Sequence, residues 1–317
     1  YSFEDQLDDY GPGTEPIRVA VDITVEESSI EVDFSRSSDQ VPAALNSYIN
    51  YTRAYTTFAV KVFCDALLPQ NEGGIRPIKT TAREGSFFNP TFPAASGGRA
   101  TVQIRIFDAI NGALSQALPH RAMGAFSHWN NPNIGGTDPR TGKSFVMYDL
   151  GFGGYGGRAD SDGPEALAPV VNCRNIPIEV HEHNNPVRIK KLELITDSGG
   201  AGQYRGGCGL RKDIELLADQ ATITLLGDRH KFAPYGLFGG HAGTKAQTIL
   251  NPDGAAEALG SKSVHQLKRG DVVSFRLAGA GGYGAPSDRD PAAVKRDLAD
   301  GFISPEHAMK NYGVDLD

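Results

Sequence analysis

Residues 197–209 read DSGGAGQYRGGCG, a block with six glycines and two charged side chains, Asp197 and Arg205. The backbone N–H groups of such a loop can surround an anion, and Arg205 could bind a phosphate or a carboxylate. The block can also be a crossover between two strands in which glycine supplies positive φ angles. The crossover is the favoured interpretation. The block is not a P-loop, because no Gly-Lys-Ser or Gly-Lys-Thr sequence follows it.

Short strands are expected on both sides of this block. Each is bounded by Gly, Asp or Pro, and repeated short strands of this kind predict a sandwich-like or barrel-like region. The expected strands span residues 178–183, 187–196, 209–217, 222–227, 246–250 and 271–278.

The N-terminal part has a different pattern. Alternating apolar residues predict a β-hairpin over residues 17–34. Ala, Leu and Tyr recur at helical spacing over residues 41–68, and a second helix is expected within 97–119. The stretch 124–165 is rich in Gly, Asn, Asp and Ser and is expected to be a long loop.

These patterns together predict an α+β fold in three parts. Residues 1–165 form a mixed part with the hairpin and the long helices, and residues 166–290 form the β-rich part. Residues 291–317 form a short helical tail, since Asp290-Pro291 has the form of an N-cap followed by proline at the first helical position.

Composition excludes several classes of function. The chain has 317 residues and a formal net charge of −7, which argues against binding to nucleic acid because that requires a basic face. No apolar run approaches the ~18 residues of a membrane span, and no signal peptide opens the chain. The three cysteines are far apart and predict no disulfide framework. A cytoplasmic location is therefore expected.

One face of the expected hairpin requires a cover. Val19, Val21, Ile23 and Val25 lie on that face, and a two-stranded hairpin is marginally stable alone. Exposing a few such side chains costs several kcal/mol at ~25 cal/mol per Å². We therefore expect another polypeptide, either a partner subunit or an upstream fragment, to cover this face.

Several further blocks accompany the 197–209 block in a fixed order. They are Asn71–Pro77 (NEGGIRP), Pro177–Glu182 (PIEVHE), Asp228-Arg229 and Gly281–Gly284 (GGYG). The set resembles the hydantoinase B/oxoprolinase family over essentially the whole chain. That family includes the B-type subunits of ATP-dependent N-methylhydantoinases and the C-terminal part of 5-oxoprolinases, and it is related to subunits of acetone and acetophenone carboxylases.

The resemblance implies an enzyme component that works within a complex. An A-type partner subunit would bind ATP and phosphorylate the amide oxygen of a small cyclic amide, and the B-type part would help to hydrolyse the activated intermediate. A divalent metal is implied for the full assembly, in an upstream B-type fragment outside this chain. Residues 131–138 (NPNIGGTD) look like the upstream metal-binding block but end in Asp where His is expected, so no metal ligation is carried over to them.

Two other readings remain open. The chain could be a subunit of an ATP-dependent ketone carboxylase, in which ATP activates a ketone enol and bicarbonate. It could also be a non-catalytic assembly subunit that scaffolds a partner.

Candidate catalytic and metal-binding residues lie in the PIEVHE block and just after it. Glu179, His181 and His183 alternate on the expected strand, so they could share a face and bind a divalent metal. The alternative is a solvated strand face. The family pattern supports Glu179 and Glu182, so these two are predicted as catalytic or orienting residues.

Other candidates come from the glycine-rich stretches. Ser198, Gly199 and Gly200 are predicted to bind the substrate or an anion, with Arg205 as a catalytic residue. Residues 151–157 could be a mobile lid with Tyr155 stacking on the substrate, or a disordered surface loop. Cys208 is expected to be a core residue and not a nucleophile, and the Asp228-Arg229 pair is expected to form a buried salt bridge or a hydrogen-bonded corner.

Overall fold

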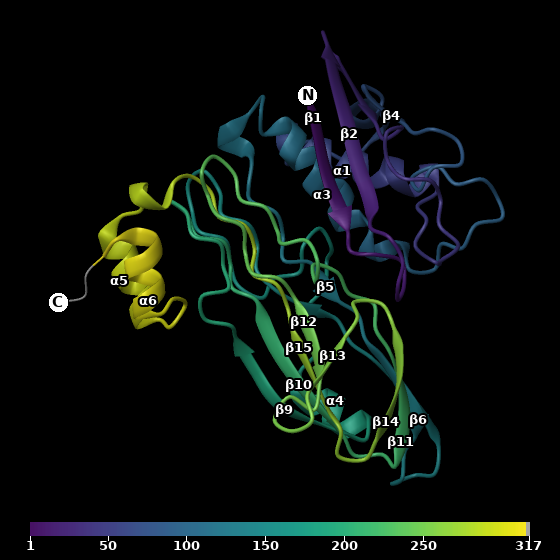
Figure 1. Cartoon of the computed structure of the whole chain (residues 1–317). Coiled ribbons are helices and arrows are strands. Elements are labelled where there is room, and N and C mark those ends of the chain that lie inside the picture. The colour runs from purple at the N-terminus through teal and green to yellow at the C-terminus, as the bar shows by residue number, and fades with distance from the viewer. Residues whose placement is uncertain (315–317) are drawn as a thin grey trace. The chain divides into compact units, whose positions relative to one another are not determined.

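The computed structural model describes residues 1–314 and divides the chain into two compact units (Figure 1). The first unit is Tyr1–Ala122, and the second begins at Met123. The boundary therefore lies well before the one expected at residue 165, because the glycine-rich stretch after Met123 hydrogen-bonds with later segments of the second unit.

The first unit contains a four-stranded sheet in the order β1-β2-β3-β4. Strand β2 pairs antiparallel with both β1 and β3, whereas β3 and β4 pair parallel. The strands are β1 (Ser2–Leu7), β2 (Ile17–Glu26), β3 (Ser29–Asp33) and β4 (Ile78–Thr81).

Helices of the same unit cover this sheet. The two long ones are α1 (Ile49–Asp65) and α3 (Gln103–Leu114), which lie within the predicted ranges and pack on each other and on the sheet. Helix α3 crosses β1 so closely that a Cβ on Gly112 would lie 2.7 Å from the ring of Phe3. The short helices are α2 (Glu72–Ile75), η1 (Arg99–Thr101) and η2 (Pro119–Arg121).

The apolar face of the hairpin is covered by the chain itself, contrary to the expectation of a second polypeptide there. Val19, Val21 and Ile23 are buried, and α3 packs against β2. Val25, near the hairpin tip, remains 55% exposed.

A β-sandwich forms one part of the second unit, as predicted. One sheet has the order β14-β11-β6-β7 and the other β13-β12-β15-β10-β9. Their inner faces meet in one core that includes Ile134, Ile223, Ile214 and Phe275. The strands are β6 (Asn133–Thr137), β7 (Ser144–Tyr148), β9 (Val187–Leu194), β10 (Leu210–Leu216), β11 (Gln220–Thr224), β12 (Gln247–Leu250), β13 (Glu257–Leu259), β14 (Val264–Lys268) and β15 (Val272–Arg276).

The other part of the second unit consists of extended segments, and we call it the glycine bundle. Its segments are residues 124–127, 153–157, 198–209, 235–243 and 279–284. They run side by side outside the regular sheets and exchange backbone hydrogen bonds (Figure 1). A Cβ on Gly279 would lie 1.8 Å from the carbonyl oxygen of Ser198, and one on Gly281 equally close to that of Tyr235.

The bundle therefore requires glycine at these positions because the neighbouring backbones lie too close together to leave room for a Cβ atom. None of the six glycines in the 197–209 block has a positive φ angle, so the reason given for expecting a crossover was wrong. The same bundle, together with β6, β7 and the short pair β5 (Trp129–Asn130) and β8 (Gly151–Phe152), organises much of the stretch expected to be a loop.

Residues 178–183 were expected to be a strand, and this prediction was wrong. They lie in helix α4 (Ile178–Asn184), whose carbonyl oxygens of Glu182 and His183 accept hydrogen bonds from Arg140 Nη1. A cation at the end of a helix is favourable. An alternating pattern over six residues is too short to distinguish a strand from a short helix. Arg140 is too distant in the sequence to indicate where the helix ends.

The C-terminal tail is helical as predicted in its described part, and residues 315–317 of the predicted tail lie outside the described residues. Asp290 caps α5 (Pro291–Ala299) by accepting a hydrogen bond from the N–H of Ala292. The other elements are η3 (Pro286–Asp288), α6 (Pro305–His307) and η4 (Ala308–Tyr312). No helix among residues 1–314 combines the length and the apolar character needed to cross a bilayer.

Candidate functional site

The residues predicted from the PIEVHE block do not share a face. Glu179, His181 and His183 lie on helix α4, where positions two apart are rotated by about 200°. Glu179 and His183 are exposed, whereas His181 is buried. Within residues 1–314, no three or more His, Cys, Asp or Glu side chains are grouped so that they could hold a metal ion. Metal binding by His181 and His183 therefore has no further ligating side chain beside it in the described part of the chain and stays a prediction.

His181 instead joins a buried ionic group. Its Nε2 donates to Asp149 Oδ1 at 3.0 Å, and Lys212 Nζ donates to Asp149 Oδ2 at 2.5 Å. Burial alone would raise the pKa of Asp149, but the hydrogen bond from His181 and the charge of Lys212 lower it below its ordinary value. This group ties α4 and β10 to the turn between β7 and β8.

Glu182 also has a structural partner. Its Oε1 accepts a hydrogen bond from the backbone N–H of Ile189 at 2.8 Å, which fixes helix α4 to the following strand β9. The catalytic roles predicted for Glu179 and Glu182 therefore stay predictions, and the observed contact of Glu182 is one that organises the fold.

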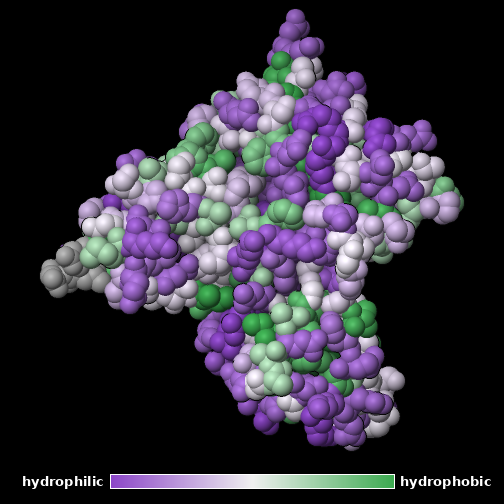
Figure 2. Space-filling view, viewed as in Figure 1, coloured by the Kyte–Doolittle hydropathy of each residue, from purple (hydrophilic) through white to green (hydrophobic). Residues whose placement is uncertain are grey.

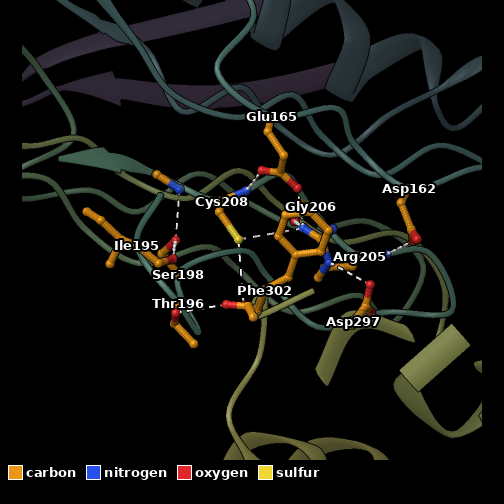
Figure 3. A network of polar contacts seen from close by, with 12 residues as sticks. Asp162, Glu165, Ile195, Thr196, Ser198, Arg205, Gly206, Cys208, Asp297 and Phe302 are labelled. Carbon is orange, nitrogen blue, oxygen red and sulfur yellow. Dashed lines mark hydrogen bonds and ion pairs between the residues drawn. The ribbon is translucent and has the colours of Figure 1, made fainter. Parts of the chain in front are cut away.

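Arg205 lies in a second buried ionic group, shown in Figure 3. Its Nη1 donates to Glu165 Oε1 at 2.8 Å, and its Nε lies 3.6 Å from Asp297 Oδ1. Arg289 donates to Asp162 at 2.7 Å and to Asp297 at 2.6 Å. The guanidinium of Arg205 thus joins the glycine bundle to helix α5 of the tail, and carboxylates of the chain already neutralise it.

Cys208 is a core residue, as expected. Its Sγ lies 3.7 Å from both Arg205 Nη1 and the carbonyl oxygen of Phe302 (Figure 3). Its backbone N–H donates to Glu165. Burial raises the pKa of the Cys208 thiol to about 11, so the reactive thiolate is scarce at neutral pH.

The N–H groups that an anion would need are largely used within the glycine bundle. The N–H of Gly200 donates to Ala280, that of Gly206 to Gly200, and that of Gly209 to Ser198 Oγ, at 2.8–2.9 Å. An anion would have to displace these bonds. Binding by Ser198, Gly199 and Gly200 stays a prediction that this geometry does not favour.

Tyr155 is fixed by its surroundings. Its hydroxyl donates to the carbonyl oxygen of Ala168 at 2.7 Å, and its ring meets Phe126 edge-on at 4.6 Å. Burial raises the pKa of Tyr155. These contacts place Tyr155 inside the bundle, and its predicted stacking on a substrate stays untested.

A third polar group has the composition that acid–base chemistry requires. We call it the Asp228 cluster, consisting of Asn130, Asp228, His230 and Lys262. Lys262 Nζ lies 3.6 Å from Asp228 Oδ1, and His230 Nδ1 lies 3.2 Å from the carbonyl oxygen of Asp228. Asp228, Arg229 and Lys262 are all buried, and Lys262 supplies a cation for Asp228, while the pairing expected between Asp228 and Arg229 stays a prediction.

Strained backbone and an unpaired polar atom mark the same place. His128 and Arg229 have φ angles of 85° and 69°, which are uncommon for residues other than glycine. Asn130 Oδ1 is buried and has no hydrogen-bond partner among residues 1–314. The carboxamide of Asn130 lies against Gly227, beside Asp228. Such features concentrate at functional sites.

Sequence reasoning missed most of this cluster. The Asp228-Arg229 pair was noted, but Lys262 precedes β14 and Asn130 ends β5, so no local spacing connects them. The sequence carried no signal for Lys262 or Asn130, because their burial near Asp228 follows only from the tertiary structure.

Comparison with known proteins places this geometry in context. The family described as Hydantoinase B/oxoprolinase matches residues 1–286. A protein of Pseudomonas sp. (strain NS671), provisionally assigned as the B-type subunit of a D-/L-hydantoinase, is 32% identical over 100% of this chain and 55% of its own length.

Two solved structures share the fold. The ATP-dependent caprolactamase from Pseudomonas jessenii matches with a TM-score of 0.87 and 26% identity, over 100% of this chain and 57% of that one. A nucleotide-free acetone carboxylase matches with a TM-score of 0.84 and 18% identity, over 100% and 49%. The chain spans about half the length of the Pseudomonas sp. protein and 24% of the length of a 5-oxoprolinase from Pestalotiopsis fici.

Proposed function

The chain belongs to the hydantoinase B/oxoprolinase family, and on that premise we propose that it is the B-type part of an ATP-dependent cyclic-amide hydrolase. An A-type subunit would be its ATP-binding partner, and a hydantoin, 5-oxoproline or a related lactam would be its substrate class. The observation that carries the proposal is the likeness to the ATP-dependent caprolactamase along the entire chain.

The Asp228 cluster is the group to which we assign proton transfer. Phosphorylation of an amide oxygen makes the amide carbon electrophilic, so that water can add to it. The C–N bond then breaks as the ring nitrogen takes up a proton, and the acyl phosphate that remains is hydrolysed to a carboxylate and phosphate. Addition of water requires a base, and departure of the ring nitrogen requires an acid. Asp228, beside the Lys262 ammonium, would accept the proton of the attacking water, and Lys262 would stabilise the negative charge that develops. Asn130 Oδ1 would orient the water, since it lacks a partner of its own among residues 1–314.

A ketone carboxylase remains the alternative, with less support. The likeness to the acetone carboxylase is at 18% identity, and at that level it shows a shared fold alone. The acid–base cluster does not by itself separate the two outcomes.

The test is an ATP-dependent assay of the B-type subunit in the form its organism makes, together with its A-type partner. We expect opening of a hydantoin, 5-oxoproline or caprolactam ring with consumption of ATP, and no product when either subunit is omitted. Fixation of bicarbonate onto a ketone without any ring opening would contradict the proposal.

Matched variants assign the reaction to the cluster. D228N and K262M should each lower kcat by roughly 100-fold or more, which is the usual contribution of a general base and of a group that stabilises charge in the transition state. D219N and K143M change exposed residues of the same unit and should leave kcat unchanged. Equal effects in both pairs would remove the Asp228 cluster from the mechanism.

A further inference from the structure

The first unit contains a cavity of about 560 Å³ that none of the assignments above uses. It lies between the C-terminal half of α1, the tip of the β2–β3 hairpin, the segment 68–78 and the residues after α3. Its walls are mainly apolar and include Val60, Phe63, Ile78 and Leu114.

The rim of this cavity presents apolar side chains to water. Val25 at the hairpin tip is 55% exposed and Leu68 is 45% exposed, and both line the cavity. Figure 2 shows hydrophobic surface just below the tip of this hairpin. Apolar surface of this kind is commonly covered in the functional protein.

We propose that apolar side chains from the remaining polypeptide of the B-type subunit fill this cavity. The inference rests on the proposed function, since it takes the chain as part of such a subunit. The chain aligns along its whole length with only 55% of the Pseudomonas hydantoinase protein and 57% of the caprolactamase chain. A comparable length of polypeptide in such proteins must therefore pack outside the fold described here.

The chemistry of the walls selects such an occupant over a charged or strongly polar ligand. The ionisable side chains that line the cavity are Lys61, Asp65, Glu27, Cys64 and Tyr1, and the charged ones have both signs. They therefore provide no uniform field that would select an anion or a cation. Large aliphatic or aromatic side chains match walls such as Phe63 and Leu114 and would gain about 25 cal/mol per Å² of apolar surface buried.

The three cysteines make this testable without any activity measurement. Cys64 lines the cavity and is exposed, Cys173 is exposed on the second unit, and Cys208 is buried. In the B-type subunit as isolated from its organism, each thiol is labelled with N-ethylmaleimide and quantified by mass spectrometry, before and after denaturation. We expect Cys64 to react more slowly than Cys173 in the native protein, by about 10-fold or more, because the occupant would cover Cys64. Residues 1–314 leave Cys64 exposed, so this protection would have to come from another part of the polypeptide. Equal reactivity of Cys64 and Cys173 would overturn the proposal.

A cross-link then identifies the occupant. A benzophenone maleimide is attached to Cys64 under mildly denaturing conditions, the protein is refolded, and the link is formed by light. A cross-linked peptide from the same polypeptide, outside residues 1–317, supports the proposal. A cross-link to the A-type partner or to a second copy of these residues overturns it, as does protection that disappears after extraction with organic solvent, which would indicate a small apolar molecule. Neither readout depends on hydrolysis, so failure here and failure of the proposed function are separate results.

Discussion

Asp149 and Lys212 form a buried ion pair at 2.5 Å, although 62 residues separate them in the sequence (positions 150–211). The pair joins the turn between β7 and β8 to strand β10, and His181 adds helix α4 to it. A buried carboxylate without its cation strongly lowers the stability of the folded protein. The stability of the second unit therefore depends on contacts between residues from three distant segments.

K212M should therefore destabilise the protein by about 3–5 kcal/mol, because it leaves the Asp149 carboxylate buried without its cation, with only hydrogen bonds from His181 and from the backbone N–H of Leu150. Urea denaturation followed by circular dichroism measures the change. R269M, which breaks the exposed Arg269–Asp219 pair, is the control and should cost less than about 1 kcal/mol. Similar losses of stability in the two variants would show that the buried pair contributes no more to stability than the exposed pair.

The same pair predicts how stability depends on pH. The pKa of Asp149 is lower in the folded protein than in the unfolded chain, as is that of Asp162 beside Arg289. The stability that these carboxylates contribute is present above their unfolded pKa, near 3.9, and is lost as the pH falls through the folded values.

Unfolding free energies measured between about pH 6 and pH 2.5 should thus fall most steeply below about pH 4. D149N should be less stable at neutral pH and should show a shallower fall in acid, since one of the responsible carboxylates is absent. An unchanged acid slope in D149N would contradict this assignment.

The glycine bundle predicts an unusually large effect for a single methyl group. G279A places a Cβ at 1.8 Å from the carbonyl oxygen of Ser198, where only backbone movement can relieve the clash. We expect a loss of about 3 kcal/mol or more, at the upper end of overpacking effects. G254A is the matched control, because nothing lies within 4 Å of that position and its φ angle is not positive. Thermal unfolding that is equally affected in both variants would rule out close packing as the reason for Gly279.

Local patterns predicted much of this fold, but not its contacts. Alternation and helical spacing located β2, β3, α1 and most strands of the sandwich, since these signals extend over a few residues. The glycines of 197–209 were misread because positive φ and close backbone approach require the same residue and leave the same mark in a sequence.

The candidate site was harder to predict for the same reason. Lys262 and Asp228 meet only because strands β11 and β14 pair, and no spacing rule anticipates that pairing. Helix α4 was taken for a strand, and this placed Glu179, His181 and His183 on one face that does not exist. The family resemblance is the basis of the proposed function, whereas the positions of individual side chains follow from the tertiary structure.

Arg205 provides the sharpest test between a structural and a catalytic role. R205M removes a buried cation that faces Glu165 and Asp297, and it should destabilise the second unit by about 3–5 kcal/mol. The tail should then detach more readily, so limited proteolysis should cleave within residues 289–312 faster than in the unmodified protein. R36M, which removes a cation from an exposed pair of the first unit, should leave this cleavage rate unchanged.

The predicted catalytic role of Arg205 gives the opposite pattern. If its guanidinium binds the substrate or a phosphate, R205K should keep the charge and the fold while KM rises, and the tail should stay as resistant to protease as before. If Arg205 acts as the tie between bundle and tail, R205K should lose stability as well, because lysine cannot reproduce the contacts that the planar guanidinium makes with Glu165, Asp297 and the carbonyl oxygen of Gly206. We expect the second result, with KM unchanged in whatever fraction remains folded.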